Sequence, residues 1–316
     1  MTNRRKGIIL MLTATVFWGF MGINSRWLNS FHISSENVAF VRCFIAALLF
    51  TLYSFIKNKN AFKTDFKGIL VSSLYGVLTL GIGLVLYSVS VERIPIAVAT
   101  VLMFSNPIWV SIYSALIFKE RISLKSAFLI FACITGCLLL MDIFTSGRIS
   151  LDPIGVLCGI GNGMTFALQI VIPKIFRGKY SSDTLLVYGF LGAAIFLFIL
   201  ASPMEIIHAI SREDQTPFLL FNLLCIGILA TFISNTFYVK STEYIGTTLP
   251  SLMAAFEPIF ASIFALIFFK EQIGFLQIIG AVIVIFSVAF LSMSDKPAET
   301  KNYLNDHSRN HTNKRS

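Results

Sequence analysis

The phrase SNPIWVSIYSALIFKERI at residues 105–122 returns in similar form as FEPIFASIFALIFFKEQI at residues 256–273. Eight of the eighteen aligned positions are identical, at a constant offset of 151. Each copy is an apolar run that contains one proline and is closed by a Lys-Glu pair near its end. The recurrence of so long a phrase indicates that the 316-residue chain is built from two related halves.

The composition of the chain predicts a lipid environment. Hydrophobic residues make up 56% of the sequence and charged residues 13%, which is about half the charged share of an ordinary soluble domain. The net charge of +9 comes from short clusters between long apolar runs, a pattern typical of basic loops beside a membrane rather than of nucleic-acid binding. The five cysteines all lie inside apolar runs without metal-ligand spacing, so neither a disulfide framework nor a metal site is expected.

The apolar runs are long enough to cross a bilayer as helices. A helical span needs about 20 apolar residues, and none of the runs shows the alternation with period two that a membrane β-barrel requires. We therefore predict an all-α integral membrane protein with ten transmembrane helices. The predicted spans are residues 7–28, 36–56, 67–90, 94–118, 123–142, 153–175, 182–201, 217–239, 246–269 and 272–293.

The repeat divides these ten spans into two sets of five. The offset of 151 also holds before the quoted phrases, where Tyr87 aligns with Tyr238. Near the start of each half the offset is 148, and there Trp18 aligns with Phe166. Because five is odd, the second half must enter the membrane from the opposite side. We therefore predict two inverted five-helix repeats, which would let a central cavity open alternately to either side.

The basic residues predict the orientation. With the N-terminus in the cytoplasm, 19 of the 25 Lys and Arg residues fall in cytoplasmic segments, five fall outside, and Arg42 lies within the second span. Such an excess marks the cytoplasmic side, so we expect a multi-pass protein of the plasma membrane, or bacterial inner membrane, with both termini cytoplasmic. The expected segments are a cytoplasmic N-terminus (1–6), a first repeat (7–142), an outer linker (143–152), a second repeat (153–293) and a disordered cytoplasmic tail (294–316).

Four phrases carry a family resemblance. They are FWGFMGINSRW (17–27), FVRCFIAALLF (40–50), SNPIWVSIYSALIFKER (105–121) and FEPIFASIFALIFFKEQ (256–272). In their order and spacing, residues 7–293 resemble the drug/metabolite transporter superfamily in its EamA-type branch. The resemblance implies a carrier of small organic solutes such as amino acids, amines, nucleotide precursors or drugs, often by efflux. In one departure between the halves, Asn106 stands where the second half has Glu257, so we expect an asymmetric site.

Glu257 is the only carboxylate deep within a predicted span. An unpaired charge at the bilayer centre costs at least about 2.5 kcal/mol, so this carboxylate must face a wet cavity, pair with a cation or hold a proton. We predict that it binds the solute or exchanges a coupling proton. The alternative is a structural hydrogen bond to the helix that Pro258 disturbs.

Other polar and aromatic side chains in the spans are candidates for the wall of the cavity. Pro107 and Pro258 each follow a polar residue. Each proline is expected either to act as a hinge at the bottom of the solute site or to bend its helix for purely structural reasons. Three roles stay open for Arg42: it attracts an anionic group of the solute, balances the charge of Glu257, or extends to the lipid headgroups. For the remaining side chains, packing between helices is the alternative role. They are Asn106, Trp18, Tyr87, Tyr238, Asn235 and Asn162.

These observations predict a secondary active transporter that works by alternating access, without cofactor, metal or catalytic residue. An integral membrane enzyme and a channel are the alternatives. Both are weaker, because the four histidines lie in loops or the tail and no metal spacing, Ser-His pairing or channel filter occurs in a span. The expected partners are a small solute, protons if transport is coupled, and the lipid bilayer, but no nucleic acid. One chain contains both repeats, and assembly as a homodimer is left open.

Overall fold

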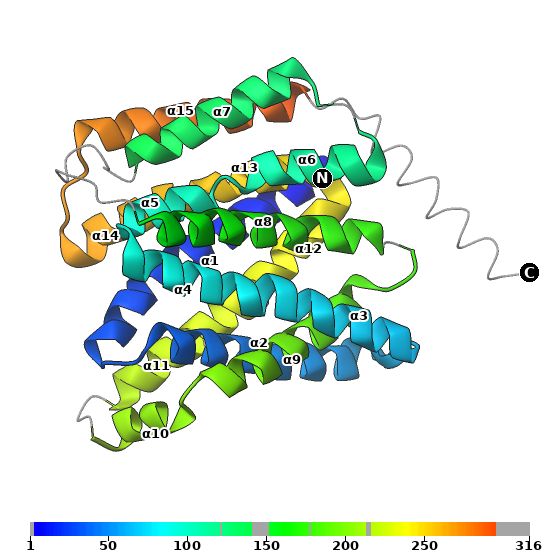
Figure 1. The fold of residues 1–316 in the computed structure, drawn as a ribbon, viewed down its shortest axis with the longest axis vertical. Helices are drawn as coiled ribbons and strands as arrows, with labels where there is room; N and C mark the ends of the chain where they lie inside the picture. Colours follow the sequence, from blue (N-terminus) through cyan, green and yellow to red (C-terminus); the bar gives the residue numbers. More distant parts are fainter. Residues whose placement is uncertain (1–2, 121, 141–151, 177, 213–215, 295–316) are drawn as a thin grey trace, which may run out of the picture.

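The computed structural model describes residues 3–120, 122–140, 152–176, 178–212 and 216–294, and all regular secondary structure in these ranges is helical (Figure 1). The first helix begins at Asn3, inside the segment that was expected to precede the first span. The expected linker, apart from Asp152, and the expected tail, apart from Ser294, lie outside the described residues.

Among the described residues, eight helices or series of joined helices are long and apolar enough to cross a membrane. Each overlaps a predicted span, with ends that agree to within six residues. Their bounds are α1 Asn3–Ser30, α2 Ser35–Lys57, α3 Phe66–Gly76 with η2 Val77–Ile82 and α4 Gly83–Arg93, α5 Ile96–Met103 with α6 Asn106–Phe118, α8 Pro153–Ile175, α9 Ser182–Leu200, α11 Thr216–Gly227 with η3 Ile228–Ile233 and α12 Ser234–Ile245, and α13 Thr248–Met253 with η4 Ala254–Phe256 and α14 Glu257–Phe269.

The other two predicted spans correspond to α7 (Leu124–Leu140) and α15 (Phe275–Ser294), whose apolar segments are shorter. These two helices lie side by side at one edge of the molecule (Figure 1). Their contact depends on small residues, because a Cβ atom on Gly136 would lie 2.8 Å from the carbonyl oxygen of Gly280. That all ten helices cross the membrane stays a prediction.

Two short helices were not predicted. They are η1 (Lys59–Phe62) and α10 (Pro203–Arg212), and neither is long enough to cross a bilayer. The sequence predicts helices from long apolar runs, and neither of these two short segments forms such a run.

Local capping explains why several boundaries fall where the sequence predicts them. At the start of α8, the carboxylate of Asp152 accepts a hydrogen bond from the Gly155 N–H (3.0 Å), and Pro153 occupies the first turn. At the start of α9, the Ser181 hydroxyl accepts a hydrogen bond from the Thr184 N–H (3.0 Å). Each side chain satisfies a backbone donor that the helix itself leaves unpaired.

The two halves repeat the same irregular features at the offset seen in the sequence. The segments η2 and η3 are both π-helical, and their first residues, Val77 and Ile228, are counterparts in the repeat. The helices α6 and α14 also begin at counterpart positions, and each is followed by a lysine in the left-handed conformation, Lys119 (φ 57°) and Lys270 (φ 56°). A positive φ is uncommon outside glycine, so its recurrence at equivalent positions indicates that the halves share one backbone design.

The contacts between the halves also come in matched pairs. Helix α1 packs against α12 and α14, and its counterpart α8 packs against α4 and α6. The matching extends to single residues: a Cβ atom on Gly7 would lie 2.8 Å from Ile245, and a Cβ atom on Gly155 would lie 2.9 Å from Ile94. Each half therefore contributes its first helix to the bundle of the other half.

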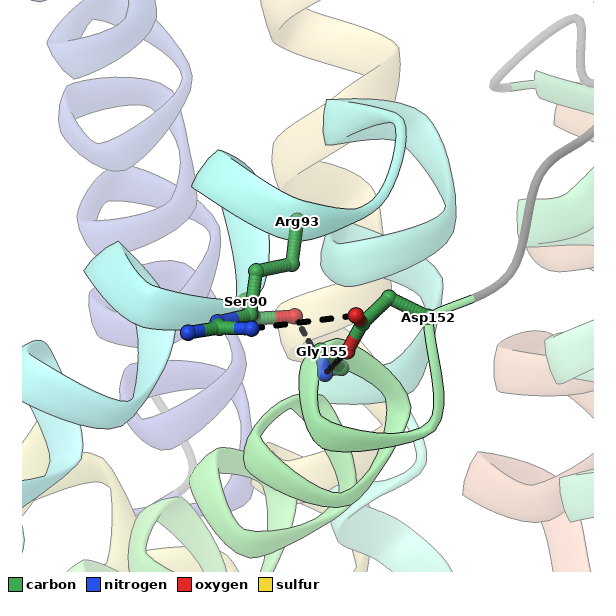
Figure 2. A network of polar contacts seen from close by, with 4 residues as sticks. All are labelled: Ser90, Arg93, Asp152 and Gly155. Carbon is green, nitrogen blue, oxygen red and sulfur yellow. Dashed lines mark hydrogen bonds and ion pairs between the residues drawn. The ribbon is translucent and has the colours of Figure 1, made fainter.

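Polar contacts hold one of these junctions together at the start of α8 (Figure 2). The Ser90 hydroxyl on α4 donates a hydrogen bond to the carbonyl oxygen of Gly155 (2.9 Å). Arg93, at the end of α4, lies 3.7 Å from the carboxylate of Asp152. Because Asp152 also caps α8, this network ties the end of α4 to the first turn of α8.

Candidate functional site

The expected kinks at Pro107 and Pro258 are breaks in the helix. Helix α5 ends at Met103 and α6 begins at Asn106, while α13 ends at Met253 and α14 begins at Glu257 after the 3₁₀ segment η4. Each proline stands in the first turn of the new helix, where its missing N–H group costs no hydrogen bond. The prolines therefore start a second half-helix instead of bending a continuous one.

The two half-helices begin with different side chains. A helix N-terminus carries unpaired N–H groups and a partial positive charge. In α14 the first residue is Glu257, whose carboxylate complements that charge, whereas α6 begins with the neutral Asn106. Asn106 is fully buried, and neither atom of its amide has a hydrogen-bond partner among the described residues. The asymmetry expected from the sequence is thus located at two equivalent helix breaks.

Glu257 is half-buried and has no direct polar partner. Its carboxylate forms no hydrogen bond or ion pair with any residue that the structure describes. Its backbone carbonyl faces α1, where a Cβ atom on Gly19 would come within 3.1 Å of the oxygen. An acidic group that nothing neutralises directly is therefore held next to α1.

Arg42 is half-buried on α2 and is oriented by two other elements. Its Nε donates a hydrogen bond to the hydroxyl of Thr231 (3.1 Å), and one terminal nitrogen donates to the sulfur of Met21 (2.9 Å). Thr231 lies in the π-helical segment η3 and donates to the carbonyl oxygen of Ile226, on the preceding turn (2.8 Å). Arg42 and Glu257 thus both approach the same part of α1, at Met21 and Gly19 respectively, and they form no ion pair with each other.

Aromatic rings from both halves meet at Trp18, the residue before Gly19 on α1. The Trp18 ring lies 6.2 Å from its repeat counterpart Phe166, edge to face, and 5.2 Å from Tyr238. Tyr238 is fully buried, and its hydroxyl has no hydrogen-bond partner within the described part of the chain. The structure therefore brings two of the predicted aromatic residues, Trp18 and Tyr238, into direct contact.

Tyr87 makes different contacts from those of Tyr238, although the two are repeat counterparts. Its hydroxyl lies 3.2 Å from the hydroxyl of Thr100 on α5. Tyr87 is half-buried, whereas Tyr238 is fully buried against Trp18. The repeat thus supplies the same residue type twice but uses it in two environments.

Two of the predicted amides, Asn162 and Asn235, take part in hydrogen bonds that connect the π-helical regions around η2 and η3 to α8. Asn162 donates a hydrogen bond to the carbonyl oxygen of Gly83 (2.7 Å), directly after η2. Asn235 donates to the carbonyl oxygen of Thr231 in η3 (2.8 Å) and accepts from Gln169 (2.9 Å). In these positions Asn162 and Asn235 make the interhelical and backbone bonds that were weighed as their alternative role.

The π-helical segments themselves were not predicted. Such segments add one residue to a helical turn and are frequent at functional sites. Their glycines were visible in the sequence: Gly76 lies before η2, and a Cβ atom there would sit 1.7 Å from the carbonyl oxygen of Gly189. In the sequence, only the glycine cluster and the constant offset of the repeat point to these two segments. Neither feature predicts a π-helical conformation.

A pocket of about 230 Å³ lies away from these residues. It opens between α2, α9 and α12 and shares no lining residue with the candidate site. Its lining residues are Phe50, Tyr53, Ser181, Ser182, Asp183, Leu186, Thr236, Val239, Lys240 and Glu243. The acidic members are already engaged, because Ser182 donates to Glu243 (2.6 Å) and Asn58 donates to Asp183 (2.6 Å).

Comparison with known proteins places the chain among transporters. The sequence profile of the EamA-like transporter family matches residues 5–142 and again residues 153–293. The chain is 25% identical to an uncharacterized inner membrane transporter, YicL, of Salmonella typhimurium over 302 residues, which cover 94% of this chain and 98% of that protein. It is also 25% identical to an S-adenosylmethionine uptake transporter of Rickettsia prowazekii over 290 residues, which cover 92% and 93% of the two chains. One solved crystal structure, 12% identical, shares the fold with a TM-score of 0.73 over 91% of this chain and 96% of that one.

Proposed function

Because the chain belongs to the EamA-like transporter family, we propose that this membrane transporter is a secondary carrier that moves a small organic solute by alternating access. The proposed location is the plasma membrane, which in bacteria is the inner membrane, with both termini in the cytoplasm. We expect efflux, the direction that the family resemblance implies. The Rickettsia relative is named for uptake, so a transport assay has to measure both directions.

We propose that the ten apolar helices form two inverted five-helix repeats, residues 7–142 and 153–293. The matched π-helical segments, the matched broken helices and the paired contacts of α1 and α8 support this arrangement. Discontinuous helices whose half-helix termini meet near mid-membrane are a known way to build a solute site between inverted repeats. The breaks before Asn106 and Glu257 provide two such termini.

The observation that carries the proposal is the unpaired carboxylate of Glu257 at the start of α14. An acidic group at that depth is costly unless a cation or a proton accompanies it. Arg42 supplies the opposite charge at the same part of α1, where it contacts Met21 and Glu257 faces Gly19, and Trp18 and Tyr238 supply aromatic surface. This arrangement fits an amino acid or another amine, with the cationic group at Glu257 and an anionic group, where present, toward Arg42.

S-adenosylmethionine is a suitable first solute to test. It carries positively charged sulfonium and ammonium groups together with a carboxylate, which are the charges that Glu257 and Arg42 complement. Amino acids that carry only the ammonium and carboxylate groups form the second set of solutes.

The test is counterflow with purified protein in liposomes that are loaded with unlabelled solute. A carrier accumulates labelled solute transiently, a channel does not, and an enzyme converts it. We expect Glu257→Gln to abolish counterflow while the protein still inserts and purifies. The matched control is Glu92→Gln, which removes the same charge from an exposed position on α4. Wild-type counterflow in Glu257→Gln would refute the assignment of the site.

A further inference from the structure

Two ion pairs occupy equivalent positions in the two halves. Arg26 on α1 pairs with Glu271, which follows α14, and Lys174 on α8 pairs with Glu120, which follows α6, at 2.6 Å. Arg26 and Lys174 are related by the shorter of the two offsets of the sequence repeat, and Glu120 and Glu271 by the longer one. The two ion pairs are therefore counterparts.

The aromatic surroundings of the two ion pairs are also equivalent. The guanidinium of Arg26 lies over the Phe269 ring, 5.1 Å from its centroid, and the ammonium of Lys174 lies over the Phe118 ring at 4.5 Å. Phe118 and Phe269 are counterparts in the repeat, and they end the two half-helices. Each cation is thus held by a carboxylate and an aromatic face at once.

The backbone presents both carboxylates in the same way. Each glutamate follows a lysine with positive φ, and its N–H donates back into the half-helix at 3.4 Å, from Glu120 to Ser114 and from Glu271 to Ala265. A non-glycine residue with positive φ is uncommon and costs free energy, so it persists where the surrounding structure requires it; here each lysine is the left-handed cap that ends its half-helix. Because the same cap ends both half-helices, Glu120 and Glu271 follow their half-helices in equivalent positions.

Each ion pair joins one half of the chain to the other. Arg26 belongs to the first half and Glu271 to the second, and the opposite holds for Lys174 and Glu120. In the proposed orientation, the Arg26 pair lies at the outer end of the molecule and the Lys174 pair at the cytoplasmic end. We propose that these pairs are the two end locks of the transport cycle: both are closed in the occluded state, and one separates when its end opens.

The two locks differ in exposure. The side chains of the cytoplasmic pair are 13% (Lys174) and 35% (Glu120) exposed, whereas those of the outer pair are 53% (Arg26) and 49% (Glu271) exposed. Solvent weakens an exposed ion pair, and separating a more buried pair leaves a charge without compensation. The cytoplasmic lock is therefore harder to break, and the carrier without solute populates the outward-open state more than the inward-open state.

The network in Figure 2 does not act as a third lock. The Arg93–Asp152 distance is 3.7 Å, and Asp152 is occupied in capping α8. The bond from Ser90 to Gly155 joins the same helices independently of this pair. This contact is therefore a fixed joint between α4 and α8.

The proposal rests on the proposed function, but its test measures distances and needs no solute. The full chain, with its five cysteines replaced by alanine, receives spin labels at exposed positions beside each lock. The outer pair of labels sits at Ser30 and Gln272, and the cytoplasmic pair at Ile122 and Lys179. Double electron–electron resonance in liposomes then gives the distance distribution at each end.

We expect Lys174→Gln to shift the cytoplasmic distances to longer values and to leave the outer ones unchanged or shorter. Arg26→Gln is expected to do the reverse. Exchanging the charges in the double variant Lys174→Glu/Glu120→Lys should restore the short cytoplasmic distance, which controls for misfolding. If neither variant moves its own end, or if one variant lengthens both ends alike, the pairs are structural braces and the proposal is wrong. Failure of counterflow in the wild type would instead contradict the proposed function.

Discussion

Trp18 and Phe166, which are counterparts in the repeat, meet edge to face with their ring centroids 6.2 Å apart. The first helices of the two halves therefore touch through a pair of equivalent residues. Residues that are equivalent by a two-fold relationship approach each other only near its axis. In the proposed inverted-repeat arrangement, the Trp18–Phe166 contact marks the pseudo-two-fold axis, and Tyr238 packs beside it against Trp18.

Removing the Trp18 ring is expected to destabilise the fold and to impair transport. Truncation of a buried tryptophan to alanine costs about 3–5 kcal/mol, since it leaves a cavity. Trp18→Ala should therefore lower the thermal unfolding temperature in detergent and reduce counterflow. Trp18→Phe keeps an aromatic ring against Phe166 and Tyr238, so it should retain most of the stability. An unfolding temperature for Trp18→Ala equal to that of the wild type would contradict the central position of this ring.

Gly19 is expected to be intolerant of even one added carbon. A Cβ atom there would lie 2.7 Å from Phe260 and 2.9 Å from the backbone nitrogen of Ala261, so α1 and α14 would have to separate. Such overpacking costs about 1–3 kcal/mol, and here it would also displace the turn that carries Glu257. We expect Gly19→Ala to lower both the unfolding temperature and the counterflow rate.

The matched control is Gly22→Ala, one turn further along α1. A Cβ atom on Gly22 would meet no atom within 4 Å. Alanine favours helix over glycine by about 0.8–1 kcal/mol, so the control should be as stable as the wild type or slightly more stable. Equal effects of the two substitutions would show that the close approach of α1 to α14 is unimportant.

Arg42 is expected to act through its guanidinium geometry as well as its charge. The bonds to Thr231 and Met21 use two different nitrogens of the fork, and a lysine ammonium cannot reproduce both. We therefore expect Arg42→Lys to reduce counterflow, and Thr231→Val to do the same because it removes the hydroxyl acceptor. Thr231→Ser keeps that acceptor and serves as the control. Wild-type rates in Arg42→Lys and Thr231→Val would show that this anchoring has no role.

Coupling to protons is expected to depend on Glu257. If this carboxylate takes up a proton when the cationic solute leaves, an imposed pH gradient should drive solute movement in liposomes. In Glu257→Gln the site cannot change its charge, so the gradient should have no effect on any residual movement. Glu92→Gln should respond to the gradient like the wild type. Retained gradient dependence in Glu257→Gln would exclude this residue as the proton carrier.

The positions of the long helices could be predicted because apolar length and helix-start chemistry are local. Residues 153–175 are both the predicted and the observed bounds of α8, where Asp152 and Pro153 define the start. The breaks before Asn106 and Glu257 were missed because the apolar runs continue through them. The sequence contains the prolines, but it does not distinguish a bend from two half-helices.

The individual contacts of the site could not be predicted from the sequence, since partner choice depends on tertiary packing. Asn162 and Asn235 were recognised as buried amides, yet nothing local indicates that they bind backbone carbonyls beside η2 and η3. Similarly, Tyr87 and Tyr238 are equivalent in the repeat but differ in burial and partners. The repeat predicts which residues correspond, and packing decides how each one is used.

The central claim is that the two halves lie in the membrane with opposite orientations. Its most direct test is the side of the bilayer on which the Lys119-Glu120 turn and the Lys270-Glu271 turn are accessible. Single cysteines at Ile122 and Gln272, both exposed, would be labelled in intact cells with a reagent that cannot cross the membrane. We predict labelling of the Gln272 position and protection of the Ile122 position until the cells are opened. Labelling of both positions from the same side would contradict the account.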